Sequence, residues 1–249
     1  MRGRVFVLLA ASLITSVVPA AAQSQGKRSI PFPHPQITEV LYDVPQGAPG
    51  DANKDGQRSA AGDEFIEIAN PYDEPIELEG YVITNRRAPF DGSEKGGVRF
   101  AFPKATLPPH AVAVIFNGYE ANIGGPVGTS EKAPAARHEA FAGALVFTIE
   151  NTSARNALAN EGDWIVLWSP EGEAIDCVSW GEPKPSPPTE VLRAQHFIDA
   201  RPGSVQRLKP DSPLVVHSSI DGTRFSPGAI PTPKAQPEIT GKGKKKSGR

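Results

Sequence analysis

Short apolar runs separated by Gly, Pro, Asn and Asp form the dominant pattern of this chain. The runs are rich in Val, Ile, Phe, Thr and Trp, which fit the pleated, half-buried surface of a β-strand. Runs of five to eight residues with turn residues between them predict an all-β sandwich or barrel. The nine predicted strands are residues 37–44, 64–70, 80–85, 98–102, 111–117, 145–151, 163–169, 174–180 and 204–208.

Alternation within the predicted strands assigns side chains to two faces. In residues 64–70, Ile66 and Ile68 share one face, and Glu67 lies on the other. The apolar faces of such strands are expected to pack together between two sheets. The residues that we expect in this core are Ile66, Ile68, Val114, Val166 and Val178.

Two stretches have features of a helix rather than a strand. Residues 130–144 are rich in alanine and begin with Ser130, which could cap a helix. Residues 189–200 place Val191 and Leu192 at helical spacing with later residues. We expect both as single helices added to a β-sandwich.

The beginning of the chain has the three parts of a secretory signal peptide. Arg2 and Arg4 provide the positive start, residues 5–18 the apolar run, and residues 20–22 a small-residue cleavage site. The alternative is a membrane anchor, but the apolar run is short for a membrane span. We therefore predict removal of residues 1–22 and a secreted or periplasmic mature protein with no transmembrane segment.

Charge is unevenly distributed along the chain. Of 26 basic and 28 acidic residues, two basic ones lie before residue 23, and six basic ones and one acidic one lie after residue 233. The segment between them has 18 basic and 27 acidic residues, a net charge of −9, which argues against nucleic acid as the primary partner. Residues 23–36 are predicted to be a linker. Residues 228–249 are predicted to be a disordered basic tail, although its lysines could contact anionic surfaces.

Motifs of known catalytic sites are absent from the sequence. The five histidines lack metal-ligand spacing, and neither a nucleophile elbow nor a phosphate-binding loop occurs. Cys177, the sole cysteine, lies in a predicted strand and is expected to be buried, so it can form no disulfide within the chain. Glu64 and Glu67 lie on opposite strand faces and cannot act together as acid and base. The sequence therefore predicts no enzymatic activity.

An acidic loop, "GDANKDGQRSAAGDEF", lies between the first two predicted strands. Asp51, Asn53 and Asp55 match oxygen ligands 1, 3 and 5 of an EF-hand loop, and the glycine that follows permits a sharp turn. Gln57 would add its backbone carbonyl, and Asp63 would complete the coordination shell. We therefore predict that these five residues bind one Ca²⁺. Ligation by oxygen alone argues against zinc.

The acidic loop departs from an EF-hand at its end and in its surroundings. Position 12, where an EF-hand has a bidentate acid, is Gly62, and predicted strands rather than helices flank the loop. The alternative is a turn without a ligand, because Asp, Asn and Gly are favoured in turns in any case.

Several segments, in order from residue 37 to about residue 227, resemble the lamin tail domain family. "ITEVLYD" and "DEFIEIANPYDEPIELEGYVITN" are similar to its first half, and "FAFPKATLPPHAVAVIF" to its middle. "PGSVQR" and "FSPGAI" are similar to its closing segment. The most diagnostic part is "LANEGDWIVLWSPEGEAIDCVSW", with Leu158, Asn160, Gly162, Asp163, Val166, Leu167, Gly172, Asp176, Val178 and Trp180.

The resemblance implies an immunoglobulin-like antiparallel β-sandwich over residues 37–227. It implies little about chemistry, because a widely shared fold hosts many functions. In animals the family forms the tail of nuclear filament proteins, but this chain has a predicted signal peptide and no heptad rod. It is more similar to exported bacterial members, in which the domain occurs beside hydrolases, nucleases and surface modules.

Three functions are compatible with the sequence. The first, which we favour, is an exported non-catalytic binding or adhesion module, stabilised by calcium, whose partner is an unknown protein or cell-surface ligand. The second is an accessory domain that partners an exported nuclease or phosphatase and reaches nucleic acid through the basic tail. The third is a hydrolase whose site cannot be read from the sequence.

Overall fold

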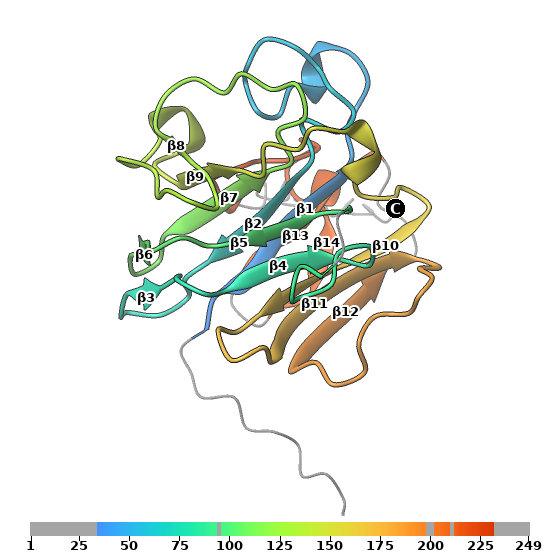
Figure 1. Cartoon of the computed structure of the whole chain (residues 1–249). Helices are drawn as coiled ribbons and strands as arrows, with labels where there is room; N and C mark the ends of the chain where they lie inside the picture. Colours follow the sequence, from blue (N-terminus) through green and yellow to red (C-terminus); the bar gives the residue numbers. More distant parts are fainter. Residues whose placement is uncertain (1–33, 94–95, 198–201, 210–211, 232–249) are drawn as a thin grey trace, which may run out of the picture.

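The computed structural model of the chain describes residues 34–93, 96–197, 202–209 and 212–231 (Figure 1). The predicted signal peptide lies outside the described residues, as do most of the predicted linker and most of the predicted basic tail. No helix in the described ranges is long and apolar enough to cross a membrane.

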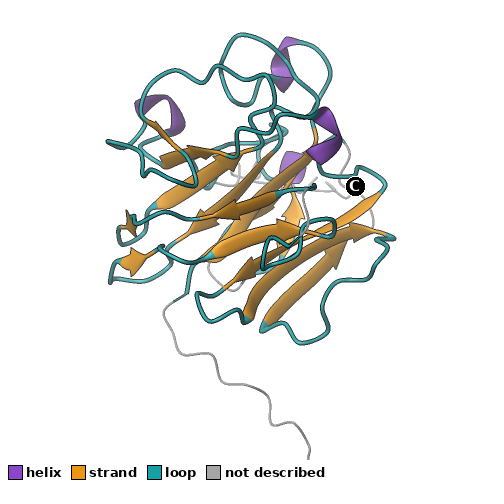
Figure 2. Cartoon of the chain, in the orientation of Figure 1, coloured by secondary structure: helices purple, strands orange, loops and turns teal. Residues whose placement is uncertain are grey.

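Two β-sheets pack face to face and form an immunoglobulin-like sandwich, with loops and short helical turns gathered at one end (Figures 1 and 2). The seven-stranded sheet has the order β14 (Leu214–Val216), β13 (Gly203–Arg207), β1 (Gln36–Asp43), β2 (Phe65–Ala69), β7 (Val112–Phe116), β9 (Leu145–Thr148) and β8 (Val127–Gly128). The five-stranded sheet has the order β12 (Arg193–Phe197), β11 (Ala174–Gly181), β10 (Gly162–Trp168), β4 (Val82–Asn85) and β5 (Arg99–Ala101).

The remaining elements are short. Strands β3 (Ile76–Glu77) and β6 (Thr106–Leu107) form a separate pair. The four 3-10 turns of the described residues are η1 (Ala48–Gly50), η2 (Glu139–Phe141), η3 (Ala154–Asn156) and η4 (His217–Ser219).

All nine predicted strands are confirmed, as β1, β2, β4, β5, β7, β9, β10, β11 and β13. Most neighbouring strands are antiparallel, and three pairs are parallel: β7 with β9, β8 with β9, and β11 with β12. Parallel neighbours need long connections, and residues 129–144 and 182–192 provide them for β8–β9 and β11–β12.

Neither predicted helix forms in the described residues of the two stretches. Residues 130–144 contain only the turn η2, after which Ala142 adopts a left-handed conformation with φ 51° that ends any helical path. Residues 189–200 contribute strand β12, because the edge of β11 provides hydrogen-bonding partners that outweigh the helical spacing of the apolar side chains.

The core predictions are confirmed as buried positions, but they divide among three apolar clusters. Ile66, Ile68 and Val178 lie in the large cluster between the two sheets, where Tyr42 and Trp180 also stack with ring centroids 4.3 Å apart. Val114 belongs to a second cluster and Val166 to a third. Both sheets therefore bury apolar side chains on their outer faces as well, beneath loops.

The edges of the two sheets are joined by one side chain. Gln195 of β12 donates a hydrogen bond through Nε2 to the carbonyl of Leu214 in β14, at 2.8 Å. The backbone N–H of Leu214 donates in return to Oε1 of Gln195, at 2.7 Å. The amide of Gln195 thus takes the place of a neighbouring strand at this edge.

Shortening the central core residue Ile68 is expected to destabilise the protein strongly. Ile68 is fully buried, and Ile68→Ala should lower the free energy of unfolding by about 2–5 kcal/mol, measured by chemical denaturation. The matched control is Val215→Ala at an exposed position of β14, which should change it by less than about 0.5 kcal/mol. Equal effects of the two substitutions would contradict the assigned core.

Candidate functional site

The acidic loop, residues 51–63, connects η1 to β2 at the end of the sandwich where loops gather (Figure 1). Backbone N–H groups around its bend bond to the side-chain oxygens of the three predicted ligands at positions 1, 3 and 5. Gly56 donates to Oδ2 of Asp51 at 3.0 Å, Asp55 to Oδ1 of Asn53 at 3.0 Å, and Gln57 to Oδ1 of Asp55 at 2.8 Å. Such bonds form tight turns around Asp and Asn side chains. The predicted ligands 1, 3 and 5 therefore lie within one compact coil of the backbone.

Glycine is favoured at the bend of the acidic loop. Gly56 has φ 91°, and the preceding turn places Lys54 at φ 61°. Both values lie in the left-handed region, which L side chains other than Asn and Asp seldom adopt. The glycine at position 6 therefore has the conformational role that the sequence predicts for it.

Asp63 closes the acidic loop by hydrogen bonding. The backbone N–H of Asn53 donates to its Oδ1 at 2.9 Å, and that of Ser59 donates to its Oδ2 at 2.6 Å. Burial raises the pKa of Asp63, while these backbone donors oppose the rise. Asp63 thus draws the two halves of the loop together.

The structure explains why position 12 of the loop carries no acid. A Cβ atom on Gly62 would lie 2.4 Å from the carbonyl oxygen of Tyr119, so any side chain there would force the two backbones apart. The position that carries a bidentate acid in an EF-hand is therefore one where the β-scaffold leaves no room for a side chain. Asp63, one residue later, is the nearest carboxylate.

Oδ1 of Asp51 is a buried oxygen for which no hydrogen-bond partner exists among the described residues. Buried polar atoms in native proteins are rarely left without a partner, and a bound ion is one way of satisfying them. No three His, Cys, Asp or Glu side chains of the described chain gather into a metal-binding group. A cation at this loop would therefore need the amide oxygen of Asn53 and backbone carbonyls beside the carboxylates.

Two neighbouring loops hold the acidic loop in place. The backbone N–H of Asn122 donates to Oδ2 of Asp55 at 3.0 Å. Nζ of Lys54 donates to the carbonyl of Ala140 and lies 4.6 Å from the ring centroid of Phe141. The end of the sandwich is thus one connected set of loops.

A second polar cluster, the Glu39–Glu67 pair, was not recognised in the sequence. The two residues oppose each other on β1 and β2, on the face turned away from the inter-sheet core, and both are fully buried. Gly228 donates its backbone N–H to Glu67 at 2.9 Å, and Ser226 donates to Glu39 at 3.1 Å. The segment 217–229 therefore covers this face. Alternation marks the two positions as polar, but only the sheet register shows that they meet.

The environment of the Glu39–Glu67 pair favours its protonated form. Burial raises the pKa of Glu67 to about 7. The pKa of Glu39 is raised well above its ordinary value. Burial is the larger cause, and the nearby charge of Glu67 is the second. His217, 3.7 Å from Glu39, has its pKa lowered by burial. The pair holds the covering segment in place.

The residues that carry the diagnostic sequence pattern have structural contacts. Asp163 accepts hydrogen bonds from Nδ2 of Asn85 at 3.0 Å and from the backbone of Ala159 at 3.1 Å. Asp176 accepts one from the backbone of Ile37 at 3.1 Å, across the sandwich. Trp180 donates from its indole nitrogen to the carbonyl of Ala159 at 2.8 Å. These side chains bind loops and sheets to each other.

The expectation that Cys177 is buried is confirmed. Cys177 is buried, and burial raises the pKa of its thiol to about 12, so it is not a nucleophile at neutral pH. Glu64 accepts a hydrogen bond from the backbone of Leu158 at 2.9 Å, apart from the Glu39–Glu67 pair.

Comparison with known families gives one match. The sequence model of the lamin tail domain matches residues 31–182, more than half of the chain. No curated protein matches the chain. The match includes the acidic loop and both acidic members of the diagnostic pattern.

Glu67→Gln is expected to remove part of the pH dependence of stability. A carboxyl group whose pKa is raised by folding stabilises the fold below its unfolded pKa, about 4.3, and this contribution is lost as pH rises through about 7. Between those values the variant should gain stability relative to wild type, by on the order of 2–3 kcal/mol. Urea denaturation at a series of pH values measures this difference.

The comparison of wild type with Glu67→Gln cancels titrating groups that Glu67 does not contact, including His217, whose lowered pKa acts with the opposite sign. Glu39 is not cancelled, because its pKa is raised in part by the charge of Glu67, and its change acts in the same direction as the substitution. Glu74→Gln, at an exposed glutamate, is the control and should show no such trend. A difference that does not vary with pH would contradict a buried, protonated Glu67.

Proposed function

Because the chain belongs to the lamin tail domain family, we propose that it is an exported, non-catalytic binding module whose acidic loop is ordered by one Ca²⁺. The family match supports an immunoglobulin-like module. Sandwiches of this kind present loops at their ends, and such loops carry binding functions on a rigid scaffold. The observation that carries the calcium part of the proposal is the buried Oδ1 of Asp51, which lacks a hydrogen-bond partner among the described residues.

The non-catalytic part of the proposal rests on how the buried carboxylates are used. Asp163, Asp176 and Glu64 accept hydrogen bonds from backbone N–H groups of other segments. Carboxylates bound in this way fix the positions of loops, which is a structural role. The lamin tail domain is also typically a non-enzymatic module.

The proposed calcium shell consists of Asp51, Asn53, Asp55, the carbonyl of Gln57, and Asp63. The three carboxylates are not gathered in the described structure and would converge when the ion binds. Asp51 contributes Oδ1, while its Oδ2 keeps the bond from Gly56. Asp63 is the most constrained member, since both of its oxygens already accept backbone N–H groups. Each carboxylate oxygen has a second lone pair, so these bonds are compatible with ligation. Calcium tolerates such irregular oxygen shells, whereas Mg²⁺ demands a near-octahedral one.

Calcium is expected to raise the melting temperature of the protein. At a Ca²⁺ concentration about tenfold above Kd, binding adds about 1.4 kcal/mol, a rise of roughly 3–5 °C for a chain of this size. The expected Kd is on the order of 10⁻⁴–10⁻³ M, as in extracellular modules. Thermal melting and isothermal calorimetry measure the two quantities, with Mg²⁺ as the competing ion.

Asp51→Asn should abolish the calcium-induced rise, because an amide N–H₂ or a weaker neutral oxygen replaces the unpartnered carboxylate oxygen. Asp55→Ala should do the same. Glu79→Gln, an exposed acid between β3 and β4, should keep the full rise. If millimolar Ca²⁺ neither releases heat nor shifts the melting curve of the wild type, the acidic loop is a turn without a ligand.

Export is tested independently of calcium. The proposal that the protein is secreted or periplasmic rests on the charged start, apolar run and small-residue site of residues 1–22. N-terminal sequencing of the protein recovered outside the cytoplasm should begin at about Gln23. Recovery of the protein with residues 1–22 intact would overturn this part of the proposal.

A further inference from the structure

A pocket of about 370 Å³ opens beside the acidic loop, at the lower end of the range of ligand sites in proteins, about 300–1,000 Å³. It lies between the segment that follows β7 and the end of β9. One wall is joined to the acidic loop, because Asn122 lines the pocket and also donates its backbone N–H to Asp55. The pocket therefore belongs to the loop end of the sandwich.

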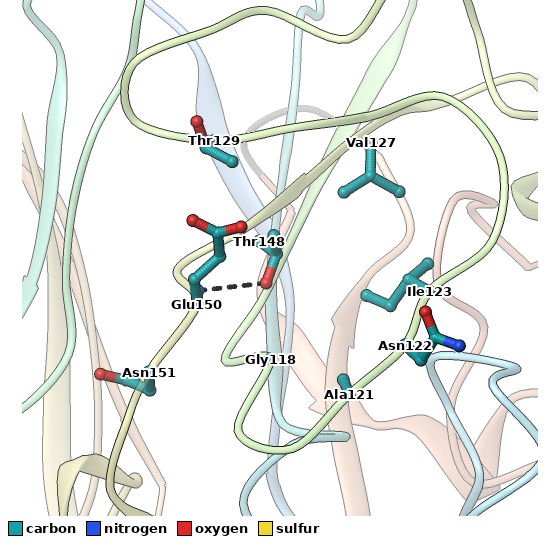
Figure 3. Close-up of a pocket in the computed structure, with 9 residues that line it drawn as sticks. All are labelled: Gly118, Ala121, Asn122, Ile123, Val127, Thr129, Thr148, Glu150 and Asn151. Atoms are coloured by element: carbon teal, nitrogen blue, oxygen red, sulfur yellow. Dashed lines mark hydrogen bonds between the residues drawn. The ribbon is translucent and has the colours of Figure 1, made fainter.

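The pocket has an apolar side and a polar side. Figure 3 draws Ile123 and Val127 on one side, Glu150 and Asn151 on the other, and Thr148 between them. No Lys, Arg or His belongs to the described residues that line it. Because its sole charge is a carboxylate, the pocket disfavours phosphate, carboxylate and other anionic ligands.

Glu150 is the member that most strongly suggests a ligand. Its backbone has φ 55°, a left-handed conformation in which Gly or Asn is the usual residue. Its backbone N–H donates to Oγ1 of Thr148 at 3.2 Å. Strained positions of this kind are frequent at ligand-binding sites. None of the described residues forms a hydrogen bond or an ion pair with its carboxylate.

We propose that this pocket binds the side chain of a lysine in a partner peptide. The proposal rests on the proposed function as a binding module and names the chemistry of its partner. The aliphatic stem of lysine would lie along Ile123 and Val127, and its ammonium group would meet Glu150. The three N–H donors of the ammonium also suit the hydroxyl of Thr148 and the amide oxygen of Asn151.

The charge of the whole module supports a basic partner. The segment between the predicted signal peptide and the predicted tail has a net charge of −9, which attracts cationic segments and speeds their encounter. A sugar ring, the main neutral alternative, would be expected to stack on an aromatic side chain, and none lines this pocket.

The test uses the full chain, labelled with ¹⁵N, and three small probes. The probes are the amides of N-acetyl-lysine, N-acetyl-norleucine, which has a similar stem without the charge, and N-acetyl-glutamate. Lysine should give saturable shift changes in the amide signals of Asn122, Thr148 and Glu150. Norleucine and glutamate should give none of comparable size, and added salt should weaken the lysine effect.

Glu150→Gln should weaken lysine binding by roughly threefold to tenfold, as expected for a charge-assisted contact at an exposed carboxylate. Glu120→Gln is the matched control, because Glu120 also has a left-handed backbone, with φ 56°, and lies close in sequence to the pocket without lining it. The spectra of both variants report directly whether they are folded.

The proposal is overturned if norleucine binds as well as lysine, if the shifts map elsewhere, or if Glu150→Gln binds lysine as tightly as the wild type. The calcium-induced melting shift is measured on the same samples. A normal calcium response without lysine binding rejects this pocket alone, whereas loss of the calcium response with lysine binding intact rejects only the calcium part of the proposed function.

Discussion

Burial of both faces of strands β1 and β2 is the constraint on which the rest of the structure depends. Every residue of β2 is buried, including Glu67. One face packs on the five-stranded sheet, so the other must be covered by something else. Apolar side chains around Phe141 cover part of it, and the segment 217–229 covers the Glu39–Glu67 pair. The buried polar pair is tolerated because each carboxyl group has hydrogen-bond donors from the segment that covers it and from its own sheet.

The same constraint gathers polar loops at one end of the sandwich. The acidic loop leaves β1 and returns to β2, the two most buried strands, and is therefore anchored at both ends by rigid structure. Its contacts through Asp55 and Lys54 then fix two further loops. A cation in this loop and a basic side chain in the adjacent pocket would thus bind to the same connected set of loops. Separate experiments test the two.

Strand positions could be predicted from the sequence, because alternation of residues such as Ile66 and Ile68 is a local signal. Strand β12 was missed, since its conformation is decided by the parallel edge of β11, which no local pattern shows. Val114 and Val166 were correctly predicted to be buried but lie outside the inter-sheet core.

For the candidate site, the spacing of Asp51, Asn53 and Asp55 predicted a compact coil. The meeting of Glu39 with Glu67 depends on register and long-range covering, which one sequence does not reveal.

The pairing of β1 with β13 means that the folding unit is longer than the segment that the family model matches. That segment ends at residue 182, whereas β13 begins at Gly203 and supplies the outer neighbour of β1. A protein that ends at residue 182 would leave the backbone edge of β1 unpaired and would expose the carboxyl groups of Glu39 and Glu67 to water. Open edges of this kind promote aggregation and proteolytic attack. The segment that the family model matches is therefore shorter than the cooperative folding unit of this chain, and the later segment is an integral part of the domain.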